Sequence, residues 1–332
     1  MFFFKIILLP FLLLVLLSNF FIATADFVSY QLVYDSVPAS FPFSLDDSSS
    51  IHGGAVETSF MHLMSLAKSL NLNFLLFYFA CMYLVIVTHQ YVFFKYYNSW
   101  FWGLIALSSW TLIIFANNFR LAIASAILIA FINLLVRGYF LLYLLVIALA
   151  STFHVAASSF LLIAVMFKYD FFYQLRYPII FLTLFAYFAN FWYDLYLIQF
   201  ASAFLPEESY LYGRILAYSL REDARVSIFS FSGLRNVIIL CISIYIDFKF
   251  RGNQWARLFL CLNFGSFFYL YSFSAFVVVG TYFHNLLFTG FSLMVCFAVG
   301  KIKIVNGYCR LLIMSITFFL LFIQFLFITR IF

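Results

Sequence analysis

The sequence predicts an all-α polytopic membrane protein with about 10–11 transmembrane helices. Hydrophobic residues make up 67% of the 332 residues and charged residues only 9%, and the mean hydropathy is +1.09. Apolar stretches recur at about the 20-residue length that crosses a bilayer core as a helix. The net charge of +6 comes from scattered single Lys and Arg residues, so no nucleic-acid interface is expected.

The apolar stretches define the helices in order. The first follows Lys5 and ends near Ala23, which is compatible with a cleavable signal peptide or with a retained helix; in either case Asp26 begins outside. Around His154 the pattern allows two short segments or one long helix. The predicted spans are 3–23, 73–94, 100–116, 119–136, 139–153, 155–167, 177–200, 233–249, 258–279, 281–299 and 310–329.

Loop charge favours two crossings around His154. Two crossings place 11 of the 18 Lys and Arg residues inside, whereas one crossing places 8 inside and 10 outside. Cytoplasmic loops are enriched in these residues, so the first arrangement is expected. Its inner residues are Lys5, Lys95, Arg137, Lys168, Arg176, Lys249, Arg251, Arg257, Lys301, Lys303 and Arg310.

This topology gives a single integral membrane domain over residues 1–332, with two larger external loops at about 24–72 and 201–232. Most acidic residues fall in these loops, and only Asp170 and Asp247 are clearly inside. The five cysteines lie in or beside apolar stretches without metal-ligand spacing, so neither disulfides nor a zinc site is predicted.

Arg120 and Arg235 are expected at the outer starts of helices, each opening a long apolar run. An arginine in the first turn opposes the positive end of the helix dipole unless an anion binds there. A planar guanidinium can grip a diphosphate through two parallel hydrogen bonds. The matched pair therefore predicts diphosphate binding, and the alternative for each residue is snorkelling to the membrane interface.

Two further residues are candidates for chemistry at the outer face. His154 lies at the outer junction of two short segments and is a candidate acid, base or diphosphate partner, or else a polar plug at a helix break. Glu57 follows Gly53-Gly54 and precedes a helical-looking stretch. It is a candidate general base for a sugar hydroxyl, or else a solvated loop acid.

The second external loop carries Tyr210, Tyr212 and Arg214 beside acidic residues. Aromatic faces and charged groups suit sugar binding, and an amphipathic interfacial helix is the alternative. The sequence contains none of the common metal or nucleotide motifs, so no metal and no cofactor are predicted. Arginines would then stabilise any leaving group in place of a divalent ion.

Two stretches of the chain match a known pattern, Asn117-Asn118-Phe119-Arg120-Leu121-Ala122-Ile123-Ala124 and Phe153-His154-Val155-Ala156-Ala157. They resemble the EpsG-like branch of bacterial polysaccharide polymerases, which includes many Wzy-type O-antigen polymerases. That family has an N-x-x-R-x-x-x-A helix followed by an F-H-x-S-A turn. The chain departs from the family at Glu57-Thr58-Ser59, where Glu-Pro-Gly is common, and at Gly280-Thr281-Tyr282-Phe283, which lacks an arginine before the Tyr-Phe pair.

The resemblance implies a membrane glycosyltransferase with a GT-C-like architecture in the bacterial inner membrane and an active site facing the periplasm. It implies that oligosaccharide repeat units on undecaprenyl diphosphate are the substrates. Partners would be the bilayer and a flippase and chain-length regulator of the same lipopolysaccharide or surface-polysaccharide pathway. In this hypothesis Arg120 and His154, helped by Arg235 or Arg214, stabilise the diphosphate, and Glu57 is the base.

The sequence leaves two other classes of function open. A flippase of lipid-linked oligosaccharide would need a polar cavity at the membrane midplane, and the sequence shows few charges there. A membrane O-acyltransferase would also place a histidine in an apolar setting, but the paired arginines argue against it.

Overall fold

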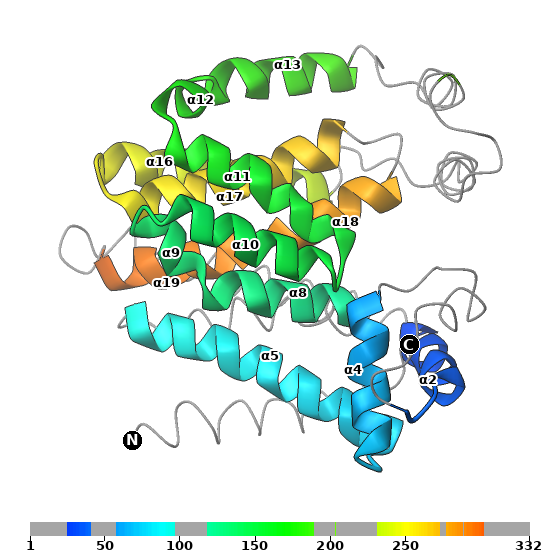
Figure 1. The fold of residues 1–332 in the computed structure, drawn as a ribbon. Helices are drawn as coiled ribbons and strands as arrows, with labels where there is room; N and C mark the ends of the chain where they lie inside the picture. The colour runs from blue at the N-terminus through cyan, green and yellow to red at the C-terminus, as the bar shows by residue number, and fades with distance from the viewer. Residues whose placement is uncertain are drawn as a thin grey trace. The chain divides into compact units, whose positions relative to one another are not determined.

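The computed structural model describes residues 25–40, 58–96, 118–188, 203, 231–272, 277–287 and 289–301 (Figure 1). Their elements are all helices, and none of these residues forms a strand, in agreement with the all-α prediction. The chain divides into two compact units: unit 1 comprises residues 1–158 and 292–332, and unit 2 comprises residues 159–291. The single membrane domain over residues 1–332 stays a prediction, because the division into compact units does not test it.

The helices of unit 1 include two that lie within the predicted first external loop. These are α2 and α4, and the pattern predicted a helix only for the second of them. The elements that begin in unit 1 are α2 (Ala25–Ser36), α4 (Thr58–Ser69), α5 (Phe74–Tyr96), α8 (Phe119–Ala130), α9 (Ile132–Val136), α10 (Phe140–Ser151) and the 3₁₀ turn η4 (Val155–Ser159).

Lys68 of α4 links this helix to α2 through hydrogen bonds. Its Nζ donates hydrogen bonds to the carbonyl oxygens of Tyr34, Asp35 and Val37 at 3.3, 2.8 and 2.7 Å. These carbonyls lie at the end of α2, where the helix dipole is negative and a cation is favourable. The Tyr34 hydroxyl also donates to the Leu72 carbonyl at 2.6 Å, so the first loop is tied to the start of α5.

The rest of unit 1 contains a parallel pair of helices, α5 and α8, and a tight hairpin that brings α10 back to α8. Near the start of α5, Phe77 and Tyr78 contact Phe119 at the start of α8. Further along both helices, His89 and Ser125 form a hydrogen bond. The two helices therefore run side by side in the same direction. After α9 the chain turns at a glycine with φ +85°, and α10 packs back against α8. The end of α10 therefore returns towards the start of α8.

Unit 2 is built around α17, which is buried along most of its length and packs against four other helices. A side chain at Gly265 would collide with Ile163 of α11, so this glycine permits close helix packing. The elements of unit 2 are α11 (Phe160–Lys168), α12 (Asp170–Gln174), α13 (Arg176–Phe188), α16 (Phe231–Lys249), α17 (Gln254–Ser272) and α18 (Val277–Leu287), and α19 (Thr289–Lys301) begins there.

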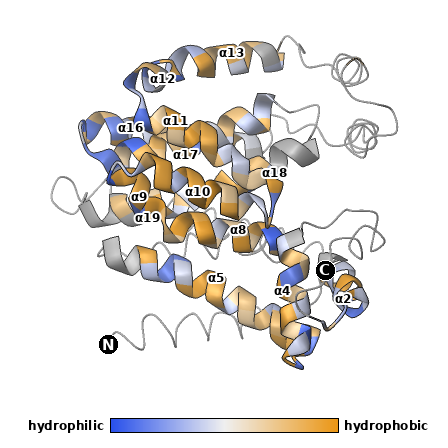
Figure 2. Ribbon diagram, in the orientation of Figure 1, coloured by the Kyte–Doolittle hydropathy of each residue, from blue (hydrophilic) through white to orange (hydrophobic). Residues whose placement is uncertain are grey.

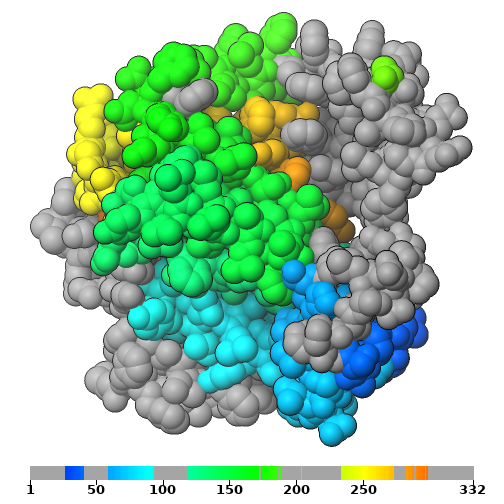
Figure 3. Space-filling model, in the orientation of Figure 1, coloured from blue at the N-terminus to red at the C-terminus, as the bar shows by residue number. Residues whose placement is uncertain are grey.

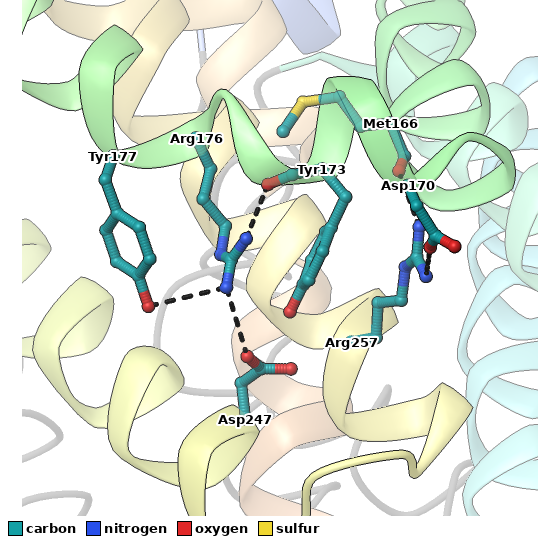
Figure 4. Close-up of polar contacts among 7 residues, drawn as sticks. All are labelled: Met166, Asp170, Tyr173, Arg176, Tyr177, Asp247 and Arg257. Carbon is teal, nitrogen blue, oxygen red and sulfur yellow. Dashed lines mark hydrogen bonds and ion pairs between the residues drawn. The ribbon is translucent and has the colours of Figure 1, made fainter.

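Ion pairs gather at one end of unit 2 (Figure 4). Arg176 pairs with Asp247 at 3.8 Å, and Arg257 pairs with Asp170 at 2.5 Å. The Tyr173 ring lies between the two guanidinium groups, whose central carbons are 3.8 and 4.2 Å from its centroid. All four charged residues were assigned to the inner loops from sequence; the structure brings them together, and their inner location stays a prediction.

Of three helix boundaries, one agrees with the sequence-based expectation and two differ from it. Two separate helices, α10 and η4–α11, flank His154, so the chain is broken there as the two-segment alternative required. The predicted boundary at residue 280 is wrong, because α18 runs through Gly280; valines on one side and aromatics on the other continue the apolar pattern across it. Helix α16 includes Phe231, so Arg235 lies beyond its first turn.

The described helices have a membrane protein's surface. Two stretches, Phe74–Val92 and Phe119–Val136, are long and apolar enough to cross a bilayer. Large apolar side chains are exposed at four-residue spacing along α10, at Leu141, Leu145 and Leu149. Figure 2 shows that α10 and α13 consist mostly of hydrophobic residues, and their exposed apolar side chains suit lipid rather than water. The predicted spans 3–23, 100–116 and 310–329 lie outside the described residues.

Candidate functional site

Arg120 occupies the first turn of α8, as the sequence predicted. Asn118 precedes the helix, and its carbonyl accepts a hydrogen bond from the Ala122 N–H at 3.0 Å. The intervening Phe119 is fully buried and anchors the start of the helix. It is surrounded by the rings of Tyr30, Phe60, Phe77 and Tyr78.

Tyr30 joins α2 to this arginine. Arg120 Nε donates a hydrogen bond to the Tyr30 hydroxyl at 3.3 Å, and the guanidinium carbon lies 5.8 Å from the tyrosine ring centroid. Tyr30 is buried, whereas Arg120 is only partly covered. The first loop therefore holds the guanidinium in place while part of it stays accessible.

His154 is buried at the break between α10 and η4, with 4% of its surface exposed. Its Nδ1 accepts a hydrogen bond from the Ala156 N–H at 3.1 Å, so the proton of the neutral ring resides on Nε2. Burial and the positive charge of Arg120 lower the pKa of His154 to about 3. The two residues thus lie within electrostatic range, and His154 is a neutral hydrogen-bond donor.

An apolar groove runs along α5 and α8 from α4. Ile123, Ile127 and Ala130 line it on α8, one, two and three turns after Arg120. Cys81 and Leu84 line it on α5. The spacing places the groove on nearly the same face of α8 as Arg120. A ligand with a charged head and an apolar tail matches this arrangement.

The remaining predicted site residues fall into two groups. Glu57, Tyr210, Tyr212 and Arg214 lie outside the described residues. Arg235 is described and is buried in unit 2, where its Nε and Nη2 donate to the side-chain oxygen of Asn236 at 3.4 and 3.3 Å. The dipole argument that singled it out does not apply one turn into a helix.

Sequence reasoning assigned no role to several polar residues that the structure places beside the arginines. Tyr30 and Asn118 adjoin Arg120, and His284 in unit 2 lies within electrostatic range of Arg235. A histidine inside an apolar stretch is costly unless it has a role, and this signal would have found His284. No group of three His, Cys, Asp or Glu side chains is placed to hold a metal in the described part of the chain.

These features define a class: a helical membrane protein with an arginine and a neutral histidine gathered at a helix start above an apolar groove. The model of the EpsG family matches residues 4–331, nearly the whole chain. The protein belongs to the EpsG family, as the resemblance indicated, and this membership accords with a polymerase-like role in polysaccharide synthesis at a membrane. No significant match was found among the curated proteins or the solved structures.

Proposed function

We propose that this protein is a membrane glycosyltransferase that polymerises oligosaccharide repeat units carried on undecaprenyl diphosphate. The reaction takes place at the periplasmic face of the inner membrane and builds O-antigen or a related surface polysaccharide. The observation that carries the proposal is the juxtaposition of Arg120, Tyr30 and His154 above an apolar groove. Family membership supports the same class of reaction.

In the proposed reaction a hydroxyl oxygen of the acceptor repeat unit attacks the anomeric carbon of the donor sugar. The bond from that carbon to the diphosphate oxygen breaks, and both electrons leave with the lipid diphosphate. The hydroxyl proton passes to a base, for which Glu57 is the candidate. The guanidinium of Arg120 and the Nε2–H of His154 stabilise the charge that develops on the leaving diphosphate.

The apolar groove on α5 and α8 supports the proposal that the substrate is linked to a lipid. An isoprenoid chain is apolar and flexible, and the small side chains of Ala126 and Ala130 leave space beside the larger Leu84 and Ile127. With the chain in this groove, its diphosphate would lie at the helix start that holds Arg120. Positioning of this kind contributes to rate because the reacting groups are already oriented.

The test is the surface polysaccharide made by a strain that carries only Arg120→Ala. The long-chain ladder on a gel is expected to disappear, leaving a lipid core capped by a single repeat unit, while the protein stays in the membrane. Arg137→Ala is the matched control, since Arg137 is an exposed arginine of the same unit at the far end of α9. A normal ladder from Arg120→Ala would refute the proposed role.

A further inference from the structure

Charged residues of unit 2 gather at one end of its helices. In the part of this unit that the structure describes, every charged residue other than the buried Arg235 lies at the end that holds the two ion pairs of Figure 4. Because the two carboxylates there pair with Arg176 and Arg257, the excess positive charge is carried by two lysines and Arg251. The residues at this end are Lys168, Asp170, Arg176, Asp247, Lys249, Arg251 and Arg257.

The two paired arginines already have a structural role. Arg176 Nη1 donates a hydrogen bond to the Tyr173 carbonyl at 2.6 Å, and Arg257 Nη2 donates one to the Met166 carbonyl at 3.3 Å. These carbonyls lie near the ends of α12 and α11, where a cation stabilises the negative end of the helix dipole. The contacts account for both arginines and leave the other three cations to be explained.

Two of these cations, Lys249 and Arg251, lie at the end of α16. Among the described residues, neither forms an ion pair or donates to a carbonyl at a helix end. Lys249 Nζ donates a hydrogen bond to the Tyr245 hydroxyl at 3.3 Å and lies 5.7 Å from the tyrosine ring centroid. Tyr245 is 44% exposed, so the ammonium is held on the outer face of the helix. Arg251 is exposed in the turn that follows, and the two cations together form a basic pair.

An exposed apolar stripe leads along α16 to the basic pair. Its side chains recur at spacings of three or four residues, so they share one face of the helix over about 15 Å. A tyrosine at the level where apolar surface meets charge is typical of the boundary between the bilayer core and its head groups. The stripe consists of Ile238, Cys241, Tyr245 and Phe248.

We propose that the stripe and the basic pair together bind one anionic phospholipid of the bilayer. An acyl chain lies along the stripe, and the phosphate of the head group accepts hydrogen bonds from Lys249 and Arg251. A zwitterionic head group brings a cation of its own, which the basic pair repels, so charge complementarity selects the anionic lipid. Each Lys or Arg close to an anionic bilayer surface strengthens binding about fivefold. The site lies within unit 2 and is independent of the proposed reaction.

The test titrates the full-length protein in detergent with phosphatidylglycerol, or with phosphatidylcholine of the same acyl chains, and counts bound lipid by native mass spectrometry. The wild type is expected to hold its tightest phosphatidylglycerol at least about tenfold more strongly than phosphatidylcholine, since two cations act together. Arg251→Gln and Lys249→Gln should each weaken that copy about fivefold and leave phosphatidylcholine unchanged. Arg137→Gln is the matched control, because Arg137 is an exposed arginine at a helix end of unit 1, and it should keep the wild-type affinity.

Phe248→Ala tests the stripe, because this ring is 72% exposed beside the basic pair, and it should weaken the same copy about tenfold. Phe181→Ala, which removes a 68% exposed ring from α13, is its control and should leave that copy unchanged. All these side chains reach the surface, so the variants should fold, and an unchanged Tm checks this. Equal affinity for the two lipids, or equal weakening by Arg251→Gln and Arg137→Gln, would overturn the site. A dimer of this chain that dissociates in Phe248→Ala without loss of bound lipid would also overturn it, since a second copy would then cover the stripe.

Discussion

At the scale of single residues, the surroundings of His154 decide which of its possible roles is open. A general acid or base for sugar chemistry works best with a pKa near the working pH. Burial and Arg120 lower the pKa of His154 to about 3, and the Ala156 N–H occupies its Nδ1. His154 is therefore suited to donating a hydrogen bond from Nε2 to a diphosphate oxygen, and the proton of the attacking hydroxyl must go elsewhere.

The pH dependence of polymerisation follows from this assignment. Because the pKa is lowered, the imidazole stays neutral as the pH falls through 6.5 and gains a proton only near pH 3. We expect the kcat/KM of the wild type with a lipid-linked repeat unit to show no acid limb from His154 between about pH 5.5 and 8. An acid limb near pH 6.5 that vanishes in His154→Gln would contradict the assignment.

At the scale of elements, the folding of the first loop onto α8 explains how Tyr30 reaches Arg120. The ammonium of Lys68 donates hydrogen bonds to the carbonyls at the C-terminal end of α2. Aromatic contacts from Phe27 to Phe74 and Tyr78 complete the attachment to α5. Helix α2 thus connects the Lys68 cap at its C-terminal end with the contact between Tyr30 and Arg120.

Lys68→Met keeps the aliphatic stem but removes the charge that caps α2. Hydrogen bonds to a charged group are worth about 1.5–3 kcal/mol each, so the loss should let α2 open. Hydrogen–deuterium exchange across α2 is expected to rise by more than about tenfold, with a parallel fall in polymerisation as Tyr30 leaves Arg120. Lys168→Met, an exposed lysine of α11, should change neither, and unaltered exchange in Lys68→Met would show that α2 is held by other contacts.

Hydropathy was sufficient to predict the long helices but could not predict the contacts that build the site. The apolar run after Arg120 is uninterrupted, so α8 and α9 were predictable, and loop charge favoured two segments around His154. The boundary at Gly280 failed because a single glycine weakens a helix by only about 1 kcal/mol and neighbouring apolar packing overrides it. Tyr30 meets Arg120 across 90 positions, and no local pattern encodes such a contact.

At the scale of the whole molecule, charged residues mark both ends of the apolar helices in each unit. Arg120 and Arg137 bracket an apolar stretch of about 25 Å, close to the thickness of a bilayer core. On α16, Arg235 and Asp247 are about 18 Å apart along the axis, and Asp247 joins the ion-pair cluster of Figure 4. Figure 3 shows side chains of the teal and green part of unit 1, which includes α8 and α10, on the face turned to the viewer.

The orientation is testable with single cysteines introduced into a cysteine-free background. Asp35→Cys, Lys168→Cys and Arg251→Cys each replace an exposed charged residue outside the long apolar helices. Asp35→Cys is expected to react with a membrane-impermeant maleimide in intact spheroplasts, and the other two only after the membrane is permeabilised, because loops rich in Lys and Arg stay in the cytoplasm. The cysteine-free parent should stay unlabelled throughout. Labelling of Lys168→Cys in intact spheroplasts would contradict the two crossings around His154, because a single crossing there places Lys168 on the same side of the membrane as Arg120.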